Sequence, residues 1–326
     1  MSKILIRPME ASEEKLRDEL AYQSYKEYAQ GDPNHFLARR GYFGTLARSD
    51  PRMKPECNRF LFCDDELASS ITVFLWPVRF RGGEILAGLI GSVCTHPDHR
   101  RRGYIRMLME DAKNFMRDEG VTVSWLYGKQ SVYGPCGYDT FNNYSILAAE
   151  DFPGPETGLT LRPLDLVSDY AAVKEIYETW NAGAFGPTVR LDGDWKDRIL
   201  AENSSRGGVA HFYSVVDSGG RVIAYCHRLS GGNIGEFGAL DEKSAARALP
   251  VIAREFGGHI QFCFDHAKVE NGAKMANAKI SRKQEAHGMW LVINGSRLGL
   301  PEHASHTELF SLLQKERFTY YSADHF

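Results

Sequence analysis

The fold of this protein is decided by the stretch Gly91-Ser92-Val93-Cys94-Thr95-His96-Pro97-Asp98-His99-Arg100-Arg101-Arg102-Gly103-Tyr104-Ile105-Arg106. Its beginning is apolar, and its middle is rich in arginine and ends at a glycine. Apolar residues then recur at intervals of three and four as far as Met116, and Gly120 stands where a helix cap is expected. The stretch therefore predicts a strand, a loop that contains glycine, and a helix.

Further strands are predicted on both sides of this unit. Their pattern places them at Arg59–Cys63, Ser70–Phe80, Glu84–Thr95 and Val121–Tyr127. The dipeptide Gly82-Gly83 is a hairpin signal between the second strand and the third. A strand, a helix and the next strand form a βαβ unit, which requires parallel pairing of its two strands.

The arginine-rich loop has the residue types of an anion site. It places successive backbone N–H groups at the start of a helix, where unsatisfied amides and the positive end of the helix dipole bind phosphate. Gly103 permits close approach of the backbone, and the arginines can add charged hydrogen bonds. The alternative for the arginines is a solvated surface.

The chain contains a short internal repeat. Ile4-Leu5-Ile6-Arg7-Pro8 predicts a strand, followed by helices over Glu13–Ala29 and Phe36–Leu46. After a segment rich in proline and glycine, Leu159-Thr160-Leu161-Arg162-Pro163 resembles the first strand and also precedes an amphipathic helix. A spaced repeat of this kind indicates duplication, although one short repeat can also arise by accident.

The second half repeats the predicted order of elements. A helix is expected over Lys243–Phe256, and strands are expected at His211–Val216, Val222–Leu229, Ile234–Ala239, His259–Cys263 and Met289–Ile293. The arginine-glycine loop, however, is replaced by Leu240-Asp241-Glu242-Lys243-Ser244. Because an acidic loop is a poor site for pyrophosphate, the second copy is expected to have lost this site.

The arginine-glycine loop resembles motif A of the GNAT superfamily of acyl-CoA N-acyltransferases, whose pattern is Arg/Gln-x-x-Gly-x-Gly/Ala. Arg100 and Gly103 match the pattern, and Ile105 departs from it at the last small position. The resemblance implies acetyl-CoA as co-substrate, with Val93, Cys94 and Thr95 facing the pantetheine arm. The coenzyme residues that it implies are Val93, Cys94, Thr95, Arg100, Arg101, Arg102, Gly103, Tyr104, Ile105, Arg106, Gly128 and Lys129. His96 and His99 are interpreted as residues that shape the loop.

A second element, Tyr133-Gly134-Pro135-Cys136-Gly137-Tyr138, resembles a segment of the enhanced intracellular survival (Eis) proteins within GNAT. In that family the first tyrosine is the general acid, and here it corresponds to Tyr133. A phenol with a pKa of ~10 is protonated at neutral pH and can donate to a developing thiolate. The alternative for Tyr133 is a role in packing or in a turn, which would make Tyr127 or Tyr138 the next candidates.

Eis proteins also use their terminal carboxylate in the active site. This chain ends in an aromatic segment, Phe318-Thr319-Tyr320-Tyr321-Ser322-Ala323-Asp324-His325-Phe326, which predicts a docked chain end. By resemblance the carboxylate of Phe326 is a catalytic or substrate-orienting group. Eis proteins are longer and carry a third domain, so their aminoglycoside activity is not carried over.

The predicted fold is mixed α/β (α+β), with tandem GNAT-type domains that each have a mixed central sheet flanked by helices. The length of 326 residues fits two domains. We expect a coenzyme-binding domain over 1–150, a linker over 151–158, a degenerate second GNAT-like domain over 159–295, and a tail over 296–326 that docks toward the active cleft.

Composition restricts the possible partners. A net charge of -3 gives no reason to expect nucleic acid, and six scattered cysteines suggest neither disulfides nor a metal site. No apolar stretch approaches the ~18 residues of a membrane span, and we expect a cytoplasmic protein without a membrane partner, possibly a homo-oligomer. The expected activity is transfer of an acetyl group to a small primary amine; a non-catalytic acyl-CoA-binding regulator and a peptide or protein N-acylase are the alternatives.

Overall fold

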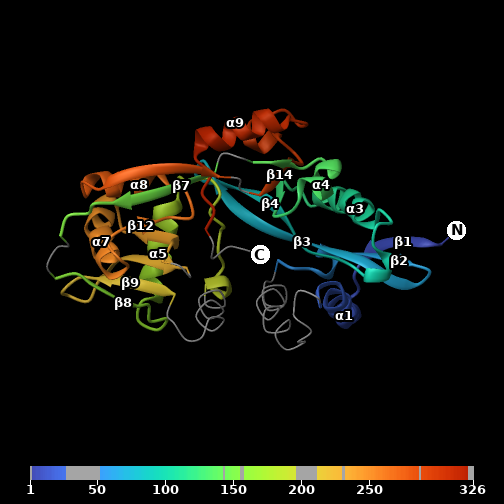
Figure 1. Ribbon diagram of the computed structural model, residues 1–326, viewed down its shortest axis with the longest axis horizontal. Helices are drawn as coiled ribbons and strands as arrows, with labels where there is room; N and C mark the ends of the chain where they lie inside the picture. The colour runs from blue at the N-terminus through green and yellow to red at the C-terminus, as the bar shows by residue number, and fades with distance from the viewer. Residues whose placement is uncertain are drawn as a thin grey trace.

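The computed structural model describes residues 2–26, 52–141, 144–154, 158–195, 211–229, 232–285 and 288–321. Two lobes lie side by side, with α9 (His306–Glu316) on top of their junction in the view of Figure 1. The described helices include none that is both long enough and apolar enough to span a membrane. Sheets and helices in each lobe confirm the predicted α/β (α+β) class, but the predicted mixed sheet is found in the first lobe, whereas the strand pairs of the second lobe's four-stranded sheet are antiparallel.

The first lobe is built on a seven-stranded sheet in the order β1-β2-β3-β4-β5-β14-β6. Its strands are β1 (Ile4–Pro8), β2 (Asn58–Cys63), β3 (Glu66–Phe80), β4 (Gly83–Thr95), β5 (Val123–Leu126), β14 (Met289–Val292) and β6 (Asp139–Thr140). Only β4 and β5 are parallel, and helix α3 (Tyr104–Asp118) joins them. The predicted βαβ unit is therefore present.

The turn between β3 and β4 explains the hairpin signal in the sequence. Phe80 pairs with Gly83, so the two turn residues are Arg81 and Gly82. Both have positive φ angles, +49° and +77°, as a type I′ turn requires. The hairpin was predicted at the right place, with the turn one residue earlier than Gly82-Gly83.

Helices flank this sheet. They are α1 (Glu14–Tyr25), α3, the short α4 (Gln130–Tyr133), and the 3-10 turns η1 (Ala11–Glu13), η2 (Pro55–Cys57), η3 (Pro97–His99) and η4 (Gly134–Cys136). The apolar stripe of α3 packs into the sheet through Leu108, Met109, Ala112 and Met116. The α3 stripe is thus the predicted one, and Gly120 follows the helix with a positive φ angle. The helix predicted over Phe36–Leu46 lies outside the described residues.

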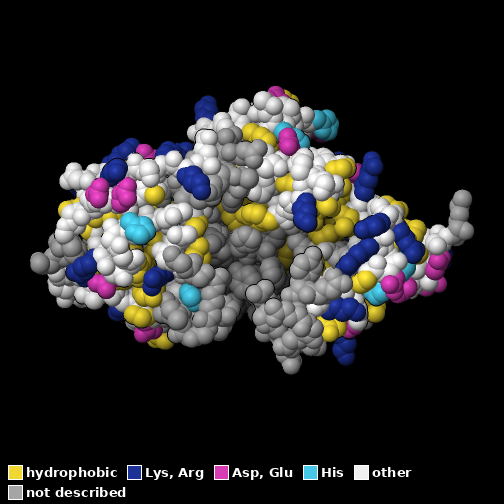
Figure 2. Space-filling view, viewed as in Figure 1, with side chains coloured by type: hydrophobic (Ala, Val, Ile, Leu, Met, Phe, Trp, Pro, Cys, Tyr) yellow, Lys and Arg dark blue, Asp and Glu magenta, His cyan; other side chains and the backbone are white. Residues whose placement is uncertain are grey.

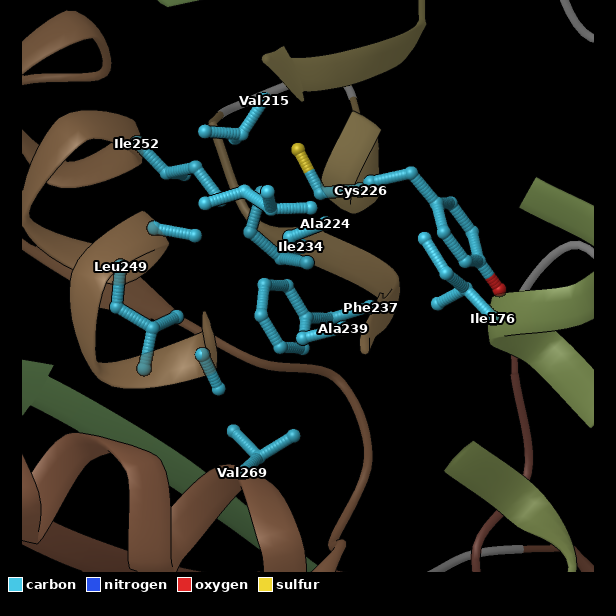
Figure 3. Packing of buried hydrophobic residues seen from close by; sticks show 14 of the residues in the cluster. Ile176, Val215, Ala224, Cys226, Ile234, Phe237, Ala239, Leu249, Ile252 and Val269 are labelled. Carbon is cyan, nitrogen blue, oxygen red and sulfur yellow. The ribbon is translucent and has the colours of Figure 1, made fainter. Parts of the chain in front are cut away.

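The second lobe has a four-stranded sheet in the order β11-β10-β9-β8. Its elements are β8 (Thr160–Pro163), α5 (Tyr170–Asn181), β9 (Phe212–Val216), β10 (Val222–Arg228), β11 (Ile234–Ala239), α7 (Glu242–Glu255), β12 (Ile260–Gln261), α8 (Ala267–Met275) and β13 (Lys279–Glu285). Figure 3 shows its core, where Leu249 and Ile252 of α7 face Cys226 and Phe237 of the sheet. This lobe therefore has a hydrophobic core of its own.

Side-chain contacts support the internal duplication. In the first copy the Arg7 guanidinium donates to the Pro8 carbonyl and makes two hydrogen bonds, 2.7 and 2.6 Å, to Glu13. In the second copy Arg162 donates to the Pro163 carbonyl and makes two hydrogen bonds, 2.6 and 2.7 Å, to Asp169. Each arginine thus ties a strand to the start of the following helix. The Arg-Pro sequence therefore makes the same kind of contacts in both copies.

Some strands from one half of the sequence pair with strands from the other half. Met289–Ile293 was predicted as the last strand of the second half, whereas β14 pairs with β5 and β6 of the first sheet. Conversely, β7 (Tyr144–Glu150) pairs with β12 and β13 in a third sheet. The domain boundaries at 150, 158 and 295 stay predictions, and backbone pairing connects the lobes across them.

Candidate active site

The first sheet opens at a fork between β4 and β5. The parallel pairing of these strands runs from Ala87 with Val123 to Leu89 with Trp125. Beyond Leu89, β4 continues to Thr95 and remains paired with β3. The two parallel strands thus part at Leu89 and Trp125. A fork of this kind offers the backbone of one strand to a ligand that enters between the two.

A β-bulge lies in β4 beyond the fork. Ser70 pairs with Cys94 and Thr72 with Gly91, so two residues of β4 oppose one of β3. Ser92, inside the bulge, has a positive φ angle of 48°. Bulges of this kind change the direction of the backbone and are frequent beside active sites.

The residues predicted to face pantetheine lie in and after this bulge. The Val93 carbonyl accepts a hydrogen bond from the Tyr25 hydroxyl, and the Cys94 carbonyl accepts one of 2.7 Å from Ser69 Oγ. The Thr95 hydroxyl lies 2.8 Å from Ser69 Oγ. These bonds fix the strand end on both sides, with α1 holding it from one side and β3 from the other.

The loop before α3 has the geometry of an anion site. Arg101 and Gly103 have φ angles of +64° and +80°, and no side chain caps this end of the helix. The first amides of α3 therefore have no partner within the helix or from a capping side chain. A Cβ atom at Gly103 would meet no other atom within 4 Å, so the space beside the backbone is open. Such a concave run of amides favours a phosphate group.

The arginines of the loop divide into two groups. Arg100 donates to the Ser24 carbonyl at the end of α1 (2.9 Å), and Arg102 donates to the Asp98 carbonyl (3.1 Å). These two side chains brace the loop. Arg101 and Arg106 are exposed and have no ion pair in the part of the chain that the structure describes. Figure 2 shows several Lys and Arg side chains gathered on this lobe.

Two further predicted coenzyme residues turn their side chains inward. Tyr104 is buried, and its hydroxyl donates to Cys63 Sγ (3.2 Å), while Ile105 packs against the core. Only their backbone amides are available at the loop. The large residue at position 105, which departs from the family pattern, is accommodated by this inward orientation.

Tyr133 lies across the fork from β4. It ends α4, and its ring packs on Gly128, where a Cβ atom would be 2.5 Å from Tyr133 Cδ2 and closer still to Cε2. Burial raises the pKa of Tyr133 to about 12, with smaller contributions from the thiols of Cys136 and Cys94. The ring packs against the core cluster that contains Ile90 of β4 and Leu126 of β5. A neutral phenol at this place is a proton donor.

The structure separates Tyr133 from Tyr138, another candidate tyrosine. Tyr138 is fully buried, and its hydroxyl lies 2.7 Å from Ser124 Oγ, which in turn donates to the Gly88 carbonyl (2.5 Å). Burial raises the pKa of Tyr138. Its hydroxyl therefore braces the closed end of the fork. Tyr127 follows β5 and is 39% exposed.

Lys129 begins α4. Its carbonyl accepts hydrogen bonds from the amides of Val132 (2.9 Å) and Tyr133 (3.1 Å), and its side chain is exposed. Gly128 and Lys129 together thus hold the short helix that carries Tyr133. Their assignment to the coenzyme stays a prediction.

The two histidines of the loop stabilise its turn, in agreement with their interpretation as residues that shape the loop. His96 Nδ1 accepts a hydrogen bond from the Asp98 amide (3.4 Å), and His99 Nε2 lies 3.2 Å from Glu66 Oε2. Ligand atoms of Glu66, His96 and His99 lie within 4.8 Å of one another, so a metal ion could be held there. Sequence reasoning missed this cluster, although the spacing of the two histidines was a signal for it.

The equivalent loop of the second lobe is closed to anions. Asp241 caps helix α7, and its Oδ1 accepts a hydrogen bond from the Ser244 amide (2.7 Å). A carboxylate thus occupies the place that a phosphate would take at this helix end. Hydrogen bonds to the amide and hydroxyl of Ser244 lower the pKa of Asp241, so the group is charged at neutral pH. The Asp241 carboxylate is thus a physical reason for the loss of the pyrophosphate site that the sequence predicts in the second copy.

The chain end passes beside the fork. Residues 318–321 are buried, and the Thr319 amide donates to the Phe185 carbonyl (2.7 Å). The Tyr320 ring meets Trp125 edge-on with centroids 5.9 Å apart. Arg317, just before this segment, is anchored by ion pairs with Asp265 and with Glu270, the latter at 2.7 Å. Phe326 lies outside the described residues.

Comparison with known proteins adds a family match for part of the chain. Residues 10–141 match the family described as "Acetyltransferase (GNAT) domain". A search of curated proteins finds no match. Among solved structures, a probable N-acyltransferase from Enterococcus faecalis V583 has 16% identity and a TM-score of 0.67, with 90% of this chain and 73% of that chain covered.

Two more solved structures are similar. Eis1 from Mycobacterium abscessus has 12% identity and a TM-score of 0.58, with 90% of this chain and 74% of that chain covered. The Saccharomyces cerevisiae N-myristoyltransferase with bound MyristoylCoA has 11% identity and a TM-score of 0.52, with 89% and 82% covered. At these identities the likeness concerns the fold.

The fork, the bulge and the loop before α3 thus lie within residues 10–141, the part of the chain that matches the GNAT acetyltransferase domain. Over 90% of the chain, the fold is similar to that of Eis1 from Mycobacterium abscessus.

Proposed function

We propose that this protein transfers an acetyl group from acetyl-CoA to a primary amine of a small molecule. The observation that carries the proposal is the open anion loop before α3, which lies at the end of the same strand that forms the β4–β5 fork. The loop would hold the pyrophosphate, and the fork would receive the pantetheine arm and the thioester. The coenzyme residues are those of the sequence prediction, with Gly128 and Lys129 acting through the α4 segment.

The reaction needs no covalent enzyme intermediate because a thioester is already activated. The amine nitrogen attacks the thioester carbonyl, the C–N bond forms, and the C–S bond breaks. Tyr133, in its neutral form, gives its proton to the departing thiolate, and it is reprotonated by the proton that the attacking nitrogen loses as the amide forms. An alkylammonium with a pKa of ~10.4 must first lose a proton, which costs about 4–5 kcal/mol at neutral pH.

The terminal carboxylate of Phe326 is proposed either to receive this proton or to orient the ammonium ion while solvent water receives the proton. Burial of residues 318–321 beside Trp125 brings the chain to the fork. Five residues remain after Tyr321, enough to span up to ~16–18 Å at ~3.3–3.6 Å each. The carboxylate is therefore within reach of the fork.

The proposal is tested by thiol release from acetyl-CoA in the presence of amines, polyamines, aminoglycosides and peptides. Release that requires a small amine supports the proposal, and release with peptides alone favours a peptide or protein N-acylase. If acetyl-CoA binds without release in any mixture, the protein is a non-catalytic acyl-CoA-binding regulator. Absence of acetyl-CoA binding would contradict both the proposed acetyltransferase and the non-catalytic regulator.

A further inference from the structure

The closed end of the fork is filled by four aromatic rings, which we call the aromatic floor: Trp125, Trp290, Phe318 and Tyr320. They come from three separate segments, namely β5, β14 and the chain after α9. Trp125 belongs to the last β4–β5 pair before the strands part. The aromatic floor thus lies where the space between the two strands ends.

The rings of the aromatic floor are closely packed. Trp125 and Trp290 stack with centroids 4.6 Å apart, and Phe318 meets Trp290 edge-on at 4.7 Å. Tyr320 meets Trp125 edge-on at 5.9 Å. All four side chains are at most 4% exposed. Protein interiors packed in this way admit extra methylene groups only if neighbouring side chains move.

The opposite face of the fork is closed as well. Ile90 of β4 and Leu126 of β5 belong to the other core cluster of this lobe, together with Tyr138. All three are buried, and the Tyr138 hydroxyl is bonded to Ser124 in the same strand. An acyl chain directed into the fork therefore meets packed side chains on both faces of the sheet.

Resting on the proposed function, we propose that the aromatic floor restricts the acyl donor to short chains, about two to four carbons, with Trp125 as the residue that sets the limit. The fold itself does not impose this limit, because the yeast N-myristoyltransferase structure of the same fold holds MyristoylCoA. The limit comes from the side chains that this sequence places at the end of the fork.

The proposal is tested by calorimetric titration with CoA, acetyl-CoA, butyryl-CoA and octanoyl-CoA, which needs no acceptor. A pocket for the chain would raise the affinity about fourfold for each buried methylene group. We expect octanoyl-CoA to bind no more tightly than acetyl-CoA. A gain of tenfold or more for octanoyl-CoA would overturn the inference and leave the proposed function intact. If CoA itself does not bind, the proposed function fails and the inference fails with it.

A pair of variants tests the residue. Trp125→Leu removes a ring at the fork, and an apolar cavity of this kind takes up apolar ligands. We expect it to raise the affinity for octanoyl-CoA relative to acetyl-CoA at least tenfold. Phe80→Leu is the matched control, since Phe80 is a buried ring of the same cluster at the β3–β4 turn. An equal change in both variants, or none in Trp125→Leu, would refute the role of Trp125. If Trp125→Leu does not fold, the titration of the unchanged protein decides.

Discussion

Gly128→Ala should impair catalysis by moving Tyr133, although residue 128 itself supplies no reactive group. The added Cβ would lie 2.5 Å from Tyr133 Cδ2. Cε2 of the same ring would lie closer still. Carbon atoms in contact are about 3.5–4.0 Å apart, so the ring must retreat by more than ~1 Å. A displacement of ~1 Å can reduce a rate by ~10²-fold. We therefore expect turnover to fall by roughly 10²-fold while acetyl-CoA affinity stays within about threefold of the parent.

Turnover by thiol release and affinity by calorimetry are the measurements. Gly183→Ala is the matched control, because a Cβ there would meet no atom within 4 Å. The decisive comparison is the double variant Gly128→Ala with Tyr133→Phe. If Gly128 acts through Tyr133, the double variant is no slower than Tyr133→Phe alone. Losses that multiply, or a Gly128→Ala protein with at least a third of the parent activity, would refute the reasoning.

Three further predictions concern the coenzyme, the general acid and the chain end. Arg101→Glu and Gly103→Asp should each weaken acetyl-CoA binding by at least ~2 kcal/mol in calorimetric titration, and unchanged affinity in both would remove the coenzyme site. Tyr133→Phe should lower turnover ~10²-fold. In the parent protein, a pKa of about 12 keeps the Tyr133 phenol protonated, so kcat should not decline between pH 8 and 10. A decline of kcat centred near pH 10 would contradict the burial of Tyr133. One or two alanines added after Phe326 should move the carboxylate by up to ~3.3–3.6 Å each and lower turnover without changing thermal stability, whereas acetylation at the parent rate would leave Phe326 without a catalytic role.

Local signals in the sequence predicted the βαβ unit, the hairpin and the loop. The spacing of apolar residues in α3 and the two residues with positive φ at the β3–β4 turn act over short stretches of chain. The acidic loop before α7 was equally readable, since Asp241 acts on an amide three residues away. Such interactions are decided by neighbours in sequence, and periodicity and turn chemistry detect them.

The remaining features depend on contacts between distant residues. The pairing of Trp290 with Trp125 joins strands far apart in sequence, and a strand pattern carries no information about its partner. The close packing of Tyr133 on Gly128 was not predicted, because nothing in the sequence indicates which ring lies on this glycine. The position of Phe318 and Tyr320 against Trp125 also follows from the tertiary fold. Local sequence patterns therefore do not predict which distant residues these aromatic side chains contact.

Because β14 lies between β5 and β6, the first sheet cannot be completed while the protein is being synthesised until Val292 has left the ribosome. During that time one edge of β5 is unpaired, and the Trp125 indole lacks its stacking partner. An open strand edge beside an uncovered aromatic surface is prone to association with other chains. Nascent chains that stop before residue 289 are therefore the ones that should need a chaperone, and a gene fragment encoding only residues 1–150 should yield insoluble protein.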